Sequence, residues 1–250
     1  MRRPIILTDL DDTLFQTMRK CPEDLMGNLA LMSTLEDGSP SGYATAAQLS
    51  FLAWLRHGTV VPVTARGRQV LARVAIEQAP AICANGGCIV LESGEIDRGW
   101  HEHLQEQSKG LDCVEAVYET LTKSIDPDIY RHWTVNEGDL ALYITIKSNR
   151  GDDADADLTD IKSRLKDAIP SGWKTHQNSN NLAYMPPWLG KRHAAKRLID
   201  VLRTRGEDGP IIGIGDSHSD TGFIDLCDFA MMPTRSQIWN EIKSRSEWVV

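Results

Sequence analysis

Short apolar runs alternate with longer amphipathic stretches through the first third of the chain. Three apolar runs are too short and uniform to show a two-residue alternation, and they predict buried strands at 5–7, 60–63 and 81–84. Two stretches with apolar residues at helical spacing predict helices at 44–57 and 67–78. Strands and helices in this order predict a parallel sheet wrapped by helices.

Residues 16–43 interrupt this order. They are polar, weakly patterned and rich in turn formers, with Gly38-Ser39-Pro40-Ser41-Gly42 as the densest group. We therefore predict a loop there, with one short helix at most.

A different pattern runs from residue 88 to residue 185. A hairpin is predicted at 88–91 with its turn at Ser93-Gly94. A first helix is marked by Leu111, Val114, Tyr118 and Leu121, and a second by Leu158, Ile161, Leu165 and Ile169. Strands are predicted at 130–135, 140–147, 173–177 and 182–185. Helix, strand, strand, helix, strand, strand predicts an α+β unit with its helices on one sheet face.

The strand at 140–147 alternates with a period of two. Leu140, Leu142, Ile144 and Ile146 fall on one face, and Ala141, Tyr143, Thr145 and Lys147 on the other. We therefore expect one packed face and one open face.

After Pro186-Pro187 the first pattern resumes. Helices are predicted at 191–205 and 219–227, and strands at 211–214 and 229–232. The predicted fold class is α/β: a doubly wound, Rossmann-like parallel sheet core built from residues 1–99 and 186–250, with an α+β domain of residues 100–185 inserted into it.

Composition adds few restrictions. The 250 residues are 41% hydrophobic and 25% charged, as is usual for a soluble globular protein. A net charge of −8 argues against non-specific binding to nucleic acid, and no apolar run is long enough to cross a bilayer. Five scattered cysteines without a C-x-x-C pair favour reduced thiols and a cytoplasmic location. Nothing here predicts the oligomeric state.

The candidate chemistry lies at the carboxyl ends of the predicted core strands, where open parallel sheets bind ligands. These ends carry Asp9, Asp11, Asp12 and Thr13; Thr64 and Arg66; Asn85; and Asp216 and Asp220. Carboxylates beside buried strands are costly unless cations converge on them. Acids from two separate strand ends suit a magnesium ion, which takes a few protein oxygens and leaves positions for water and phosphate.

Lys191 supplies a candidate cation. It opens a predicted helix, where a positive side chain opposes the helix dipole, so an anionic neighbour is the better reason for it. Each feature alone has a simpler explanation: Asp11, Asp12 and Thr13 can cap a turn, and a lysine is usually a solvated charge. Four features follow one another along the chain: the group Asp9–Thr13, then Thr64, then Lys191, then the pair Asp216 and Asp220. Together, in this order, they favour a phosphoryl-transfer site.

These residues resemble the motifs of the haloacid dehalogenase superfamily of phosphohydrolases. Asp9-Leu10-Asp11-Asp12-Thr13 resembles its first motif, Thr64 its second, Gly190-Lys191 its third, and the stretch from Gly215 to Asp220 its fourth. The insert resembles the cap domain of subfamily IIB, the Cof-type and sucrose-phosphate phosphatase-like group, and Asn85-Gly86 also fits that subfamily.

The resemblance implies a role for each residue. Asp9 is expected to attack phosphorus, and Asp11 to protonate the leaving group and then activate water. Thr64 and Lys191 are expected to contact the phosphoryl group. Mg²⁺ is expected to bind the Asp9 carboxylate, the Asp11 carbonyl and Asp216. Asp220 is expected to contact these ligands without binding the ion itself.

Substrate contacts are expected from Arg66, Asn85, Tyr143 and Lys147, the last two on the open face of the cap sheet. Ala65 and Ser219 depart from the subfamily motifs, but neither removes a charge.

The sequence thus predicts a magnesium-dependent phosphatase, a phosphoric monoester hydrolase that acts through an aspartyl phosphate. Its expected substrate is a small phosphate ester, such as a sugar or sugar-acid phosphate. Two alternatives stay open: a phosphomutase of the same fold, and a catalytically silent binding protein that keeps the fold.

Overall fold

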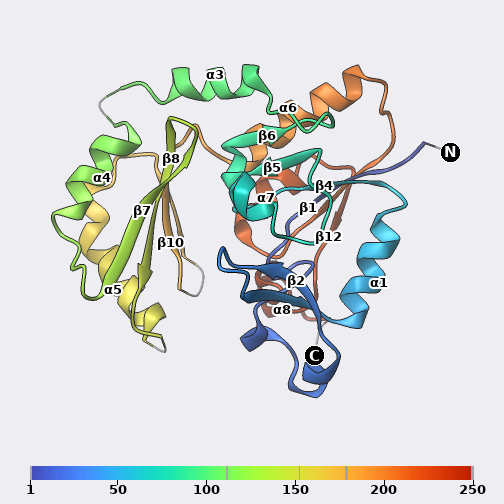
Figure 1. Cartoon of the computed structure of the whole chain (residues 1–250), viewed down its shortest axis with the longest axis horizontal. Coiled ribbons are helices and arrows are strands. Elements are labelled where there is room, and N and C mark those ends of the chain that lie inside the picture. The colour runs from blue at the N-terminus through green and yellow to red at the C-terminus, as the bar shows by residue number, and fades with distance from the viewer. Residues whose placement is uncertain (1, 111, 152, 178–179, 249–250) are drawn as a thin grey trace. The chain divides into compact units, whose positions relative to one another are not determined.

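The computed structural model describes residues 2–110, 112–151, 153–177 and 180–248. The chain divides into two compact units: residues 1–97 with 191–250, and residues 98–190 (Figure 1). The predicted cap bounds of 100–185 stay a prediction.

The first unit is built on a four-stranded parallel sheet with the order β12-β11-β1-β4. Its strands are β1 (Ile5–Thr8), β4 (Thr59–Pro62), β11 (Ile211–Ile214) and β12 (Phe229–Met231). Its helices are α1 (Ala46–Leu55), α2 (Arg68–Leu71), α6 (Lys191–Thr204), α7 (His218–Ile224) and α8 (Gln237–Ser244). The predicted α/β class is confirmed.

Strand β1 lies between β11 and β4, and all four of its residues are buried. Its uniformly buried side chains suit this central position. A single parallel bridge from Val63 to Ile82 joins β4 to β5 (Ala81–Cys83). β5 pairs antiparallel with β6 (Cys88–Val90) through the short turn η3 (Ala84–Gly86). The predicted hairpin at 88–94 is reduced to one bridge, between Val90 and Ile96.

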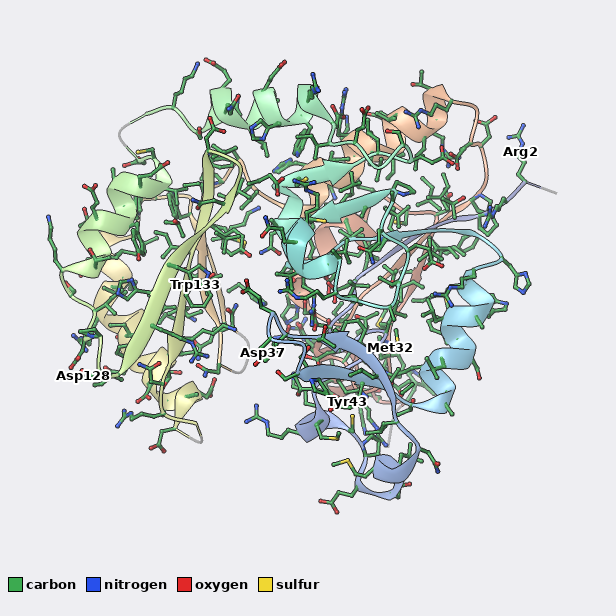
Figure 2. The ribbon with its side chains drawn as sticks, viewed as in Figure 1. Arg2, Met32, Asp37, Tyr43, Asp128 and Trp133 are labelled. Carbon is green, nitrogen blue, oxygen red and sulfur yellow. The ribbon has the colours of Figure 1, made fainter. Side chains whose placement is uncertain are left out.

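The prediction of a loop at 16–43 was wrong. The structure has two short 3₁₀ turns, η1 (Met18–Lys20) and η2 (Glu23–Asn28), and a hairpin of β2 (Ala30–Thr34) and β3 (Pro40–Ala44). Figure 2 labels Asp37 at the hairpin tip and Met32 and Tyr43 on its strands. Two register shifts in this hairpin remove the two-residue alternation, so the sequence pattern did not show it.

The predicted helix at 67–78 was too long, since α2 ends at Leu71. The following residues pair with β2 instead: the Thr34 N–H donates to the Arg73 carbonyl, and the Ala75 N–H donates to the Met32 carbonyl. The hairpin therefore takes the backbone groups that a longer helix would have used. Helix α8 was not predicted.

The second unit contains an antiparallel sheet with the order β7-β8-β10-β9. Its strands are β7 (Tyr130–Glu137), β8 (Leu140–Ser148), β9 (Lys174–Gln177) and β10 (Leu182–Met185). Its helices are α3 (Arg98–Gln107), α4 (Val114–Thr122), α5 (Ala154–Leu165) and the 3₁₀ turn η4 (Lys166–Ala168). From α4 onward the predicted order of helices and strands is present. Helix α3, which precedes them, was not predicted, and Leu111 lies outside the described residues.

Helices α4 and α5 cover one face of this sheet, as expected (Figure 1). The regular alternation predicted for β8 fails near its start, because a register shift lies opposite Leu142. Ala141 therefore joins Ile144 and Ile146 in the core that α4 and α5 cover. The sequence had placed Ala141 on the opposite face.

The predicted open face of β8 was also wrong at Tyr143 and Thr145, which are only 6% and 4% exposed. Thr145 lies opposite Trp133 on β7 and Ala183 on β10, and these neighbours help to cover it. Among the described residues, no helix has the length and apolar character that crossing a membrane requires.

Candidate active site

The carboxyl ends of three neighbouring strands meet beside Asp9. The Asp9 N–H donates to the Ile214 carbonyl on β11, and the Val63 N–H donates to the Thr8 carbonyl on β1, both at 2.8 Å. This pairing places the residues after β1, β4 and β11 at one edge of the sheet. Asp9, Thr64 and Asp216 are all buried there.

Lys191 binds two of the buried carboxylates. Its Nζ lies 2.6 Å from Asp9 Oδ1 and 2.7 Å from Asp220 Oδ1, and the side chain is nearly inaccessible to solvent. The anionic neighbour predicted for this lysine is therefore present. Burial disfavours its charge, but the two carboxylates outweigh that effect and raise the pKa of Lys191 above its ordinary value.

The site carries more negative charge than Lys191 can balance. Asp9, Asp216 and Asp220 place one oxygen each within 4.8 Å of one another, with a single ammonium group among them. Burial and the nearby Asp220 carboxylate raise the pKa of Asp216 to about 7, and burial also raises the pKa of Asp9. A divalent cation would supply the missing charge.

The donor set fits magnesium. Its ligands would be hard carboxylate oxygens from two separate segments, as Mg²⁺ prefers. The Thr13 hydroxyl lies 3.4 Å from Asp9 Oδ2 and 3.5 Å from Asp216 Oδ1, between the two acids. Asp9 and Asp216 would hold the ion.

Asp220 has a different environment from the other two acids. Its Oδ2 accepts from the N–H groups of Asp216 and Ser217, at 3.2 and 3.0 Å, and from the Ser217 hydroxyl at 2.9 Å. Its Oδ1 accepts from Lys191. Asp220 is therefore suited to orienting the loop after β11 rather than to direct coordination. The Ser217 contact was missed, although Ser217-x-x-Asp220 reads as a helix capping pair in the sequence.

Asp11 is held by Arg66, which the sequence had suggested as a substrate contact. The guanidinium donates two hydrogen bonds to the Asp11 carboxylate, at 2.8 and 2.7 Å. Its Cζ atom also lies over the Phe15 ring, 5.3 Å from the ring centre, as in a cation–π contact. The pair is partly open to solvent, with 47% of the Asp11 side chain exposed.

Asp12 binds a third cation, Lys20 of η1. Its backbone is left-handed, with a φ of 62°, as an aspartate in a tight turn allows. Sequence reasoning missed Lys20, because it lies in the region that was predicted to be a loop and has no motif around it.

Thr64 and Asn85 belong to one connected turn. The Thr64 hydroxyl accepts from the Arg66 N–H at 3.1 Å, and the Thr64 carbonyl accepts from the Asn85 N–H at 3.0 Å. Asn85 also has a left-handed backbone, with a φ of 56°. These contacts fix Thr64 at the end of β4. Tyr143 and Lys147 belong to the second unit, and their part in the site stays a prediction.

Solved structures share this fold. No protein-family model matches the chain, and no curated protein matches it in sequence. A sucrose-phosphatase from Synechocystis, solved with sucrose and phosphate, aligns with a TM-score of 0.57 and 12% identity over 100% of this chain and 90% of that one.

Two more structures agree with this result. A trehalose-6-phosphate phosphatase related protein gives a TM-score of 0.51 and 22% identity over 91% of this chain and 85% of that one. A haloacid dehalogenase-like hydrolase from B. subtilis gives 0.53 and 14% over 97% and 93%. The chain therefore has the fold of haloacid dehalogenase-type phosphatases, as its motifs suggested.

Proposed function

We propose that this protein is a magnesium-dependent phosphatase that hydrolyses a small phosphorylated metabolite through an aspartyl phosphate on Asp9. One observation carries the proposal: Lys191 and the acids Asp9, Asp216 and Asp220 meet at the carboxyl end of the central strand. Three carboxyl groups around one ammonium group offer the excess of hard oxygen ligands that a site for a divalent cation requires. The shared fold supports the same reading.

Asp9 is the proposed nucleophile. A carboxylate oxygen of Asp9 forms a bond to phosphorus while the bond from phosphorus to the ester oxygen breaks. Lys191 holds the other side of this carboxylate and favours its ionised form in a buried position. When bound, Mg²⁺ would neutralise the phosphate charge and polarise its oxygens.

Asp11 is the proposed proton carrier. Its carboxyl group gives a proton to the departing alkoxide, and the resulting carboxylate then takes a proton from water as that water attacks phosphorus and releases Asp9. The guanidinium of Arg66 occupies both oxygens of Asp11 in the structure, so at least one oxygen must leave Arg66 before it can carry a proton. Thr64, fixed by its turn, is the proposed hydroxyl donor to the phosphoryl group.

A sugar or sugar-acid phosphate is the proposed substrate class. One protein with this fold is a sucrose-phosphatase, and another is a trehalose-6-phosphate phosphatase related protein. Arg66, Asn85 and Lys147 are the proposed contacts to the leaving group, whereas Tyr143, expected among them, is only 6% exposed. The five free cysteines support a working location in the reducing cytoplasm.

Substitution at the two proposed catalytic acids tests this function. We expect Asp9→Asn to abolish Mg²⁺-dependent phosphate release from a panel of sugar phosphates, and Asp11→Asn to slow it by about 10²–10⁴-fold. Asp37→Asn, at the exposed hairpin tip, is the matched control and should act like the wild type. Wild-type turnover by Asp9→Asn would contradict the mechanism.

Measuring the isomerised sugar phosphate beside the free phosphate separates the alternatives. A phosphomutase would convert one sugar phosphate into its isomer and release little free phosphate. A silent binding protein would not hydrolyse even a generic aryl phosphate in the presence of Mg²⁺.

A further inference from the structure

Helix α8 contacts the loop that carries Asp216 at three points. The Ile238 N–H donates to the Asp216 carbonyl at 3.0 Å. The side-chain oxygen of Gln237 accepts from the His218 N–H at 3.1 Å, and Glu241 Oε2 lies 3.1 Å from Nε2 of the His218 ring. The first turns of α8 thus bind the backbone on both sides of Ser217.

These contacts complete the fixation of Asp216. Its N–H donates to Asp220 at the start of α7, and its carbonyl accepts from Ile238 at the start of α8. Both peptide groups of Asp216 are therefore held, each by a different helix. The direction in which the Asp216 carboxylate leaves the backbone depends on both helices.

Packing alone does not explain the place of α8. No residue of the helix is fully buried, and its apolar side chains Ile238 and Trp239 are only partly buried, so it adds little to the hydrophobic core. Its N-terminus is fixed by the buried Ser236, whose hydroxyl accepts from the Trp239 N–H at 3.0 Å. What α8 presents to the rest of the unit is this anchored first turn, which meets the Asp216 loop.

We propose that α8 is a positioning element for the metal ligand Asp216, and that Gln237 and Glu241 are its positioning residues. The inference rests on the proposed function, since it takes Asp216 to be a ligand of the divalent cation. Gln237 acts on the backbone of His218, and Glu241 acts on its ring. Loss of either contact loosens the loop at His218 and weakens cation binding without removing a ligand.

Metal binding without substrate is the direct test. Mn²⁺ serves as the probe, and its affinity is measured by electron paramagnetic resonance on the full chain. We expect Gln237→Ala and Glu241→Ala each to weaken Mn²⁺ binding by about tenfold, the lower end of the range for residues that orient a metal ligand. Phosphate release at saturating Mg²⁺ should stay within about twofold of the wild type, because no reacting group is lost.

Three further variants separate positioning from a general loss of structure. Glu241→Gln keeps an oxygen that can accept from the His218 ring and should restore wild-type affinity. Asn240→Ala changes an exposed residue of the same helix, and Arg245→Ala removes the other ionic partner of Glu241. Neither should alter Mn²⁺ affinity.

Unchanged Mn²⁺ affinity in both alanine variants would overturn the proposal, as would equal weakening in Asn240→Ala. If the wild type binds Mn²⁺ but hydrolyses no phosphate ester, the proposed function fails and the positioning role still stands or falls on the affinities. If the wild type binds no Mn²⁺ at all, both proposals fail.

Discussion

Each aspartate at the carboxyl end of β1 binds a cation from a different part of the chain. Asp9 binds Lys191 of α6, Asp11 binds the guanidinium that follows β4, and Asp12 binds an η1 lysine. The three pairs differ in exposure: only the Lys191 pair is buried, whereas the other two are partly solvated. Exposed pairs add little to stability, so of the three cations Lys191 should cause the largest loss of stability when it is removed.

Replacing Lys191 tests how much it contributes to stability. Lys191→Met leaves Asp9 and Asp220 buried without a cation, and we expect the free energy of unfolding in the presence of a chelator to fall by about 3–5 kcal/mol. Urea unfolding followed by circular dichroism measures this change. Added Mg²⁺ should recover part of the loss. Lys196→Met, on the exposed side of the same helix, is the control and should change little. Equal stability of Lys191→Met and wild type would refute the argument.

Asp157 gives the second unit a pH dependence. Arg150 and the Ser148 hydroxyl bind its carboxylate and hold the pKa of Asp157 below its ordinary value of 3.8. A lowered pKa means that Asp157 stabilises the fold above that ordinary value and that this contribution is lost as the pH falls through the lowered pKa.

Asp157→Asn should therefore lower stability at neutral pH and bring it closer to the wild type in acid. We expect a clear gap in urea midpoints between the two proteins at about pH 7 and a much smaller gap at about pH 3. Asp160→Asn, whose side chain is exposed on the same helix, should show little gap at either pH. A gap that widens in acid would contradict the assigned direction.

At the scale of elements, the β2–β3 hairpin packs directly onto Phe15 at Gly42. A Cβ atom at this glycine would lie 2.4 Å from the Ser33 hydroxyl and 2.8 Å from the Phe15 ring. Phe15 is fully buried and carries the Arg66 guanidinium on its ring. The hairpin therefore contacts the ring on which the guanidinium of the pair formed by Arg66 and Asp11 rests.

Gly42→Ala should loosen this support. We expect a loss of about 1–3 kcal/mol in the free energy of unfolding, as for overpacked cores, and faster amide hydrogen exchange in residues 30–44. Mass spectrometry after deuterium labelling resolves that segment. Gly27→Ala is the control, because its added methyl group meets no atom within 4 Å. Unchanged exchange in the hairpin would show that the contact at Gly42 can relax freely.

The same hairpin shows which elements a sequence pattern can predict. β1 and α6 were readable, because one is uniformly apolar and the other has a clear apolar stripe. The hairpin was not, because its register shifts remove the alternation on which a strand prediction depends. Its pairing with residues 73–75 then shortened a helix that the local pattern favoured.

The candidate site divides in the same way. The positions of Asp9, Thr64, Lys191 and Asp216 were predictable, since strand and helix ends fix them through the backbone. The partners of the other groups depend on tertiary contacts: Arg66 turning to Asp11, Lys20 to Asp12, and α8 to the loop after β11. No local pattern encodes such contacts.

At the scale of the whole molecule, the proposed metal site belongs entirely to one unit. Asp9, Asp216, Asp220 and Lys191 all lie in the unit formed by residues 1–97 and 191–250, although residues 98–190 separate them along the chain. Asp97, the last residue before the second unit, is tied back to α6 by Arg197 at 2.9 Å. The ends of both connections are thus anchored on the helix that presents Lys191.

A cation that binds at this site should therefore stabilise one unit selectively. At a hundred times its dissociation constant, Mg²⁺ adds about 2.7 kcal/mol to the stability of the state that binds it. We expect Mg²⁺ to slow amide hydrogen exchange in β1, β11 and α7 and to leave β7, β8 and β10 nearly unchanged. Asp216→Asn should remove the protection, because it neutralises a ligand, whereas Asp139→Asn, in the β7–β8 turn, should keep it. Equal protection of both sheets would place the cation elsewhere.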